Sequence, residues 1–157
     1  IYGSNGVCQV EHIGSMELQG VPDDKMYYTL VPVYEKKSRL FTPVDNHKVV
    51  MRPVISKKEA CDLIDHMQEM QVFEIQNEKN RDTVFKEALK TGDCEELVRV
   101  IKTIYEKKQE RKAQGKKVTA GDERYFKLAE EHLYGELAIA LGIEKDKVSS
   151  YIEKRIA

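Results

Sequence analysis

The sequence predicts an α+β protein in which a small antiparallel β-barrel precedes an all-α helical bundle. Up to residue 54, short runs of β-branched and aromatic residues alternate with glycine-rich turns, as is typical of antiparallel strands. From Ser56 onward, apolar residues recur every three or four positions, as in amphipathic helices. The periodicity changes within the run 42–56. We therefore expect a β domain over residues 1–54 and a helical domain over residues 55–157.

The β domain is predicted to contain four or five short strands. The clearest patterns lie at residues 7–13, 26–34 and 39–44. Pro32 cannot donate to a strand ladder, so its strand is expected to lie at an edge or to bulge there. Several short antiparallel strands favour an SH3-like or Tudor-like barrel. Such barrels usually bind protein or nucleic acid through an edge or rim, and they are rarely catalytic.

The helical domain is predicted to be one compact bundle of five helices. Ser56 and Glu59 have the spacing of a capping box, which marks the start of the first helix. Thr119 with Asp122 marks the start of the fourth helix, and Gly142 stands where a C-terminal capping glycine belongs. The expected helices cover about residues 57–70, 78–90, 94–112, 120–141 and 145–155.

Composition excludes several classes of protein. Lys and Arg number 26 against 27 Asp and Glu, a net charge of -1, so the overall charge favours no class of partner. Three widely spaced cysteines without a CxxC pair predict small buried side chains in a reducing compartment: Cys8, Cys61 and Cys94. No apolar run approaches the roughly 20 residues of a membrane helix, and no signal-peptide pattern is visible. We expect a cytoplasmic protein, with a few native residues missing before Ile1.

No arrangement of residues predicts catalysis, a metal or a cofactor. The four histidines are isolated and fit no metal-ligand spacing. There is no GxSxG, P-loop or GxGxxG motif. The adjacent pairs Glu95–Glu96 and Glu130–Glu131 diverge by about 100° on a helix, so neither pair converges on a substrate. The sequence therefore predicts a protein that is not an enzyme.

Local charge is more informative than total charge. Residues 102–117 include seven basic side chains against two acidic ones, a local excess of +5. One reading is a solubilising helix end, where cations also suit the helix dipole. The other is an edge that contacts phosphates and supplies affinity without sequence information. Lys79, Arg81, Arg124 and Lys127 would extend that edge if the second and fourth helices start close together.

Six short segments follow one another along nearly the whole chain. They are YGSNGVC at residues 2–8, PVDN at 43–46, MRPV at 51–54, KQER at 108–111, TAGDER at 119–124 and GELA at 135–138. No single segment is specific, but in this order and spacing they resemble the CarD/CdnL family of bacterial transcription regulators.

The resemblance implies a Tudor-like domain, shared with the transcription-repair coupling helicase, that docks on the β subunit of RNA polymerase. It implies a helical domain that contacts promoter DNA at the upstream edge of the melted bubble and stabilises the open complex. No helicase motif is present, so the coupling factor itself is excluded. The implied localisation is cytoplasmic, at the nucleoid through RNA polymerase.

The resemblance also implies site residues. Polymerase contacts are expected at the barrel edge, at Met16, Tyr28, Arg39, Phe41 and Val44. DNA contacts are expected at Lys79, Arg81 and Arg124, and local charge adds Lys112, Lys116, Lys117 and Lys127. Well-known members carry a tryptophan wedge before the second helix of this domain. This chain has no tryptophan and carries Glu78 at that place.

Two functions are therefore open. The first is a non-catalytic regulator that binds the RNA polymerase β subunit and contacts promoter DNA, which modulates the stability of the open complex. The alternative is a protein-only adaptor that docks on RNA polymerase without touching DNA. A salt-dependent DNA affinity distinguishes the two, because only phosphate contacts produce it.

Overall fold

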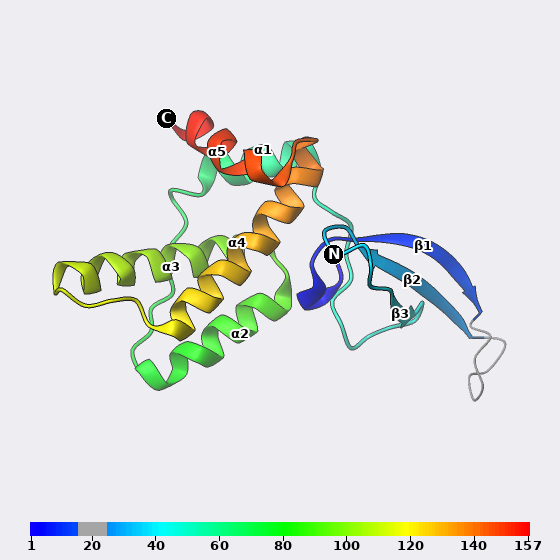
Figure 1. Cartoon of the computed structure of the whole chain (residues 1–157), viewed down its shortest axis with the longest axis horizontal. Coiled ribbons are helices and arrows are strands. Elements are labelled where there is room, and N and C mark those ends of the chain that lie inside the picture. Colours follow the sequence, from blue (N-terminus) through cyan, green and yellow to red (C-terminus); the bar gives the residue numbers. More distant parts are fainter. Residues whose placement is uncertain (16–24) are drawn as a thin grey trace. The chain divides into compact units, whose positions relative to one another are not determined.

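The computed structural model describes residues 1–15 and 25–157, and the chain divides into two compact units, 1–53 and 54–157. The first unit is built on an antiparallel sheet in the order β1-β2-β3 (Figure 1). Its strands are β1 (Cys8–Ser15), β2 (Met26–Pro32) and β3 (Leu40–Pro43), preceded by the 3-10 turn η1 (Gly3–Asn5). The second unit is helical. The protein is thus α+β, with the β unit first.

The sheet differs in detail from the expected barrel. Three strands are formed by the described residues, where four or five were expected, and closure into a barrel stays a prediction. Pro32 ends β2, while the register shift lies in β1 between Val10 and His12. The two ends of the unit pair with each other: Tyr2 bridges to Met51, and the Arg52 N–H donates to the Ile1 carbonyl at 3.1 Å.

Strand register separates the two faces of the sheet. Residues directly opposite each other in antiparallel strands share a face. Tyr28 lies opposite Thr42, whereas the next residue, Thr29, lies opposite Phe41. Thr42 and Leu30 are 1% and 2% exposed, so their face is the covered one. Phe41 is on the other face and is 51% exposed.

The helical unit contains the expected five helices (Figure 1). They are α1 (Lys57–His66), α2 (Arg81–Thr91), α3 (Cys94–Ala113), α4 (Ala120–Leu141) and α5 (Val148–Ile156). The 3-10 turns η2 (Glu78–Asn80) and η3 (Lys145–Lys147) lead into α2 and α5. None of the described helices is long and apolar enough to cross a lipid bilayer.

Local signals explain where most of these helices begin and end. The hydroxyls of Ser56 and Thr119 accept from the N–H of the residue three positions on, at 3.1 and 3.2 Å. Gly142 ends α4 in the left-handed conformation, with φ of +68°. α1 is shorter than expected and ends at His66. The carbonyls just beyond it, at Met67 and Gln68, accept instead from the Lys102 ammonium.

The core of the helical unit lies where α3 and α4 run side by side and the other helices close around them (Figure 1). Phe85 of α2 is fully buried and meets Tyr125 of α4 edge to face, with ring centroids 5.6 Å apart. Fully buried side chains of α1, α3, α4 and α5 fill the rest of the core: Ile64, Leu97, Val100, Ile104, Leu133, Leu137 and Val148. This packing holds α2 against α4 and so positions the residues at the starts of the two helices.

Candidate functional site

The helices α2 and α4 start next to each other. The Arg81 guanidinium donates to both carboxylate oxygens of Asp122, at 2.8 and 2.7 Å. The Tyr125 hydroxyl donates to Asp82, the second residue of α2. The basic edge was expected to extend to these helices only if they start close together, and they do. The periodicity of the sequence does not show this proximity.

Arg81 is held more tightly than a phosphate contact requires. Its side chain is 13% exposed and that of Asp122 is 9% exposed. The guanidinium also lies 5.0 Å from the centre of the Phe85 ring. Its charge is therefore balanced by a carboxylate that takes two of its N–H donors, which suits an anchor between two helices better than a contact with DNA.

The other residues expected at this edge are exposed. Lys79 lies in η2, and Arg124 and Lys127 lie in the first turns of α4. Arg124 leans over the Tyr125 ring at 5.1 Å. Lys86 and the Tyr125 hydroxyl hydrogen-bond to Asp82 and lower the pKa of that carboxyl, so the edge keeps one ionised acid near its centre.

The basic run over residues 102–117, in α3 and the loop after it, divides into two groups. Lys102 donates to backbone carbonyls after α1, Lys107 pairs with Glu78 at 3.4 Å, and Arg111 Nε donates to the Lys117 carbonyl at 2.8 Å. These three cations are engaged within the helical unit. The remaining four are exposed and have no ion-pair partner among the described residues: Lys108, Lys112, Lys116 and Lys117. Only this second group is free to bind phosphate.

Glu78, where the resemblance leads us to expect a tryptophan, lies in η2, just before α2. Its side chain is 67% exposed, and its carboxylate neutralises Lys107. An exposed carboxylate at this point repels phosphate rather than entering a groove. Any DNA contact in this protein therefore relies on the neighbouring cations.

The residues expected to contact polymerase do not form one patch. Phe41 and Tyr28 lie on opposite faces of the sheet, and Tyr28 is half-buried. Arg39 makes a two-pronged ion pair with Glu11, at 2.9 and 3.1 Å, with both side chains about half exposed. Val44 is 43% exposed just after β3. Met16 lies outside the described residues.

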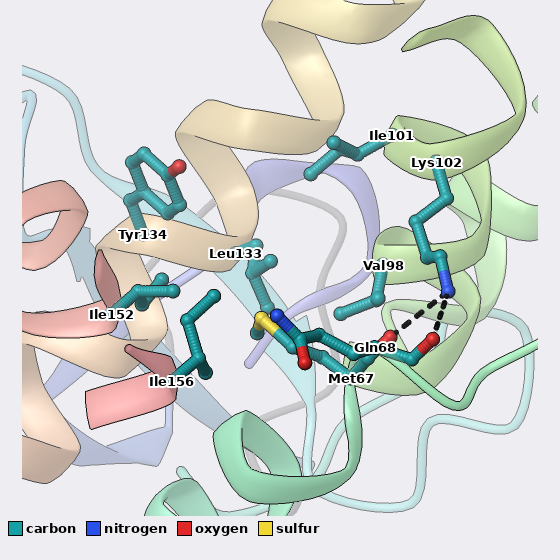
Figure 2. Close-up of a pocket in the computed structure, with 9 residues that line it drawn as sticks. All are labelled: Met67, Gln68, Val98, Ile101, Lys102, Leu133, Tyr134, Ile152 and Ile156. Carbon is teal, nitrogen blue, oxygen red and sulfur yellow. Dashed lines mark hydrogen bonds between the residues drawn. The ribbon is translucent and has the colours of Figure 1, made fainter. Parts of the chain in front are cut away.

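An apolar cavity of about 190 Å³ opens in the helical unit between the end of α1 and helices α3, α4 and α5 (Figure 2). Lys102 is at its edge, but its ammonium turns away to the carbonyls of Met67 and Gln68 (Figure 2). Burial raises the pKa of Tyr134, another lining residue, so its hydroxyl stays protonated. The lining offers no ionised group to a reactant. Ile101, Leu133, Ile152 and Ile156 supply much of its wall.

The described residues contain no group of histidine, cysteine and acidic side chains that could hold a metal ion. The histidines still shape stability. Burial lowers the pKa of His132 below 6.5, while the smaller effects of the nearby Glu131 and Lys145 charges oppose each other. His66 has the opposite shift, because its ring bonds to the Asp62 carbonyl, which raises its pKa.

We expect the free energy of unfolding to fall, through His132, as pH drops from about 7.5 to 5.5. The unfolded chain binds the proton more readily than the folded one, so protonation favours unfolding. His66 acts in the opposite sense in the same window. Urea unfolding of wild type and His132→Gln, measured across this range, isolates the contribution of His132. A stability difference between the two proteins that does not change with pH would contradict the assignment.

Two family models match the chain and together span nearly all of it. Residues 1–55 match the CarD-like/TRCF RID domain, and residues 62–153 match the CarD C-terminal domain. These matches define a transcription factor with an RNA polymerase-interacting domain, and such proteins are non-catalytic. The chain belongs to the CarD family. The first domain implies binding to the β subunit of RNA polymerase.

Proposed function

We propose that this protein contacts promoter DNA through its helical unit while its N-terminal unit binds the RNA polymerase β subunit, and that the contact changes the lifetime of the open complex. The observation that carries the proposal is the juxtaposition of the α2 and α4 starts, joined by Arg81 and Asp122. It supports the proposal because Lys79 directly precedes α2 and Arg124 lies in the first turns of α4.

Charge supports the same proposal. Lys112, Lys116 and Lys117 are exposed, and the short loop 114–118 leads directly into α4. The loop is held in shape, because the Lys116 N–H donates to the Arg111 carbonyl at 2.8 Å while the Arg111 side chain binds the Lys117 carbonyl. Lysines on an ordered loop contact phosphate at a lower entropic cost than lysines on a disordered one. Lys127 continues this cationic set along α4.

The experiment that tests the proposal measures open-complex lifetime with and without the protein, alongside capture of the isolated β lobe. The proposed function expects capture and a changed lifetime together. Capture with an unaltered lifetime and no added footprint on DNA would overturn the DNA half. Heparin challenge on a promoter that forms an unstable open complex gives the widest range for this measurement.

The polymerase contact is proposed to centre on Phe41. A phenylalanine that is 51% exposed on β3 can bury a large apolar area against a partner. Phe41→Ser is expected to weaken capture of the β lobe by about tenfold or more, with little change in unfolding. Val10→Ser is the matched control, because Val10 is 46% exposed on the other outer strand. Equal losses from the two variants would argue against a contact at Phe41.

The adaptor function is favoured by one observation, the exposed Glu78 beside the proposed DNA edge. In that case the helical unit would recruit a protein and would give a flat salt response. Glu78→Gln separates the two functions. It should increase DNA affinity if the edge binds phosphate, since a repulsive charge is removed, and should leave binding unchanged if DNA is not a partner.

A further inference from the structure

Glu136 is the most deeply buried carboxyl group among the described residues, at 1% exposure in the C-terminal third of α4. One carboxylate oxygen accepts from the Ile55 N–H at 2.9 Å, and the other accepts from the Cys94 thiol at 3.1 Å. A buried carboxyl is costly unless it is hydrogen-bonded, so these contacts are what make the position tolerable. A hydrophobic side chain would fill the site more cheaply, which points to a role beyond packing.

The position of Ile55, which donates its N–H to Glu136, indicates what that role is. Ile55 is the second residue of the helical unit and immediately precedes Ser56, which caps α1. The hydrogen bond from Ile55 crosses 81 positions of sequence. It therefore ties the point at which the chain enters the helical unit to the C-terminal third of α4.

The chain is also fixed on the other side of the unit boundary. The Arg52 N–H donates to the Ile1 carbonyl at 3.1 Å, within the first unit. Between these two anchored amides lie only Pro53 and Val54. The proline ring holds its own φ near −65°, and a residue that precedes proline is held in extended conformations. Few backbone rotations are left between the two anchors.

We propose that Glu136 is a positioning residue that confines the hinge between the two units to Pro53 and Val54. Loss of its bond to Ile55 releases the backbone up to the Ser56 cap and lengthens the hinge. A short hinge restricts the orientations that the two units sample. A role of this short hinge in transcription rests on the proposed function, in which one unit binds polymerase and the other binds DNA. The existence of the hinge does not rest on that function.

The test replaces Glu136 by Met, which keeps the length of the side chain without its acceptors, and by Gln, which keeps one carbonyl oxygen. Amide hydrogen exchange of Ile55 is compared with that of Leu137, a core residue next to the site. We expect Ile55 protection to fall by about 3- to 10-fold relative to Leu137 in Glu136→Met, as for a lost hydrogen bond. An unchanged ratio in folded Glu136→Met overturns the proposal. Glu136→Gln keeps an acceptor for the Ile55 N–H and is expected to stay nearer the wild-type ratio.

A second measurement reads the hinge directly. Spin labels on keto amino acids at Lys37 and Lys90, both exposed, leave the three cysteines in place. The distance distribution between them is expected to broaden in Glu136→Met. Asp122→Ala is the matched control, because it removes another buried carboxylate of α4 that does not touch the junction. Equal broadening in the control would show general loosening and would overturn the assignment.

Cys94→Ala separates the two bonds of Glu136. It removes the thiol donor and leaves the Ile55 bond, so the Ile55 to Leu137 ratio is expected to stay at the wild-type value. A failure of the proposed function looks different. Wild-type protein would then leave open-complex lifetime unaltered, while Glu136→Met would still broaden the distances.

Discussion

Replacing Asp122 with alanine is expected to lower the free energy of unfolding of the helical unit by about 3 kcal/mol. The substitution leaves the Arg81 guanidinium 13% exposed and without the carboxylate that it binds through two hydrogen bonds. A charge left uncompensated in a largely buried site carries most of this cost. Chemical unfolding followed by far-UV circular dichroism measures the loss.

A comparison with an exposed pair makes the expectation specific. Asp65 and Arg155 have the same two-pronged geometry, at 2.7 and 2.9 Å, but their side chains are 42% and 35% exposed. Asp65→Ala should therefore cost less than about 1 kcal/mol. Losses of similar size at Asp122 and Asp65 would contradict the view that burial makes the Arg81 pair important.

The double variant Arg81→Met with Asp122→Leu separates anchoring from DNA contact. Apolar replacements of both partners are expected to restore most of the lost stability. If Arg81 serves only as an anchor, the double variant also keeps its affinity for DNA. A stable double variant with clearly weakened binding would instead return Arg81 to the set of phosphate contacts.

Reversing Lys116 and Lys117 to glutamate is expected to weaken binding to duplex DNA by more than about tenfold at low salt. Two exposed cations are lost and two repulsive charges are introduced on the loop before α4. The slope of log affinity against log salt should become shallower by about 1.8, from two lost phosphate contacts at about 0.9 each. Fluorescence anisotropy over a range of potassium chloride concentrations measures both quantities.

The control for this prediction is Lys57→Glu with Lys58→Glu. It makes the same change in net charge on two exposed residues in the first turn of α1. Glutamate is also favoured there by the helix dipole, so stability is expected to hold. If both double variants weaken DNA binding equally, net charge and not the α3–α4 loop accounts for the effect.

Much of the fold follows from local patterns in the sequence. The capping residues Ser56 and Thr119 and the terminal glycine Gly142 mark helix ends at or near those observed, because each satisfies backbone groups within a few residues. The end of α1 was placed about four residues too late. The side chain responsible, Lys102, lies in another helix, and no local pattern near His66 shows it.

The candidate site was predicted less completely. The run of cations over residues 102–117 is visible in the sequence, but its division into residues engaged within the fold and free lysines is not. Lys107 and Arg111 are engaged by Glu78 and by the Lys117 carbonyl, and the sequence shows neither pairing. Glu136 was missed altogether. The one available signal was an acidic residue between Leu133 and Leu137 on an otherwise buried stretch of α4.

The sequence by itself determined the α+β order of the two units, the five helices and the family, because these depend on periodicity, capping and short ordered motifs within the chain. Only the tertiary structure decided which charged side chains are available to a partner and which are paired within the fold. The pairings of Arg81 with Asp122 and of Ile55 with Glu136 join residues 41 and 81 positions apart. Such contacts arise when helices pack, and the energy of a charge depends on what that packing places beside it.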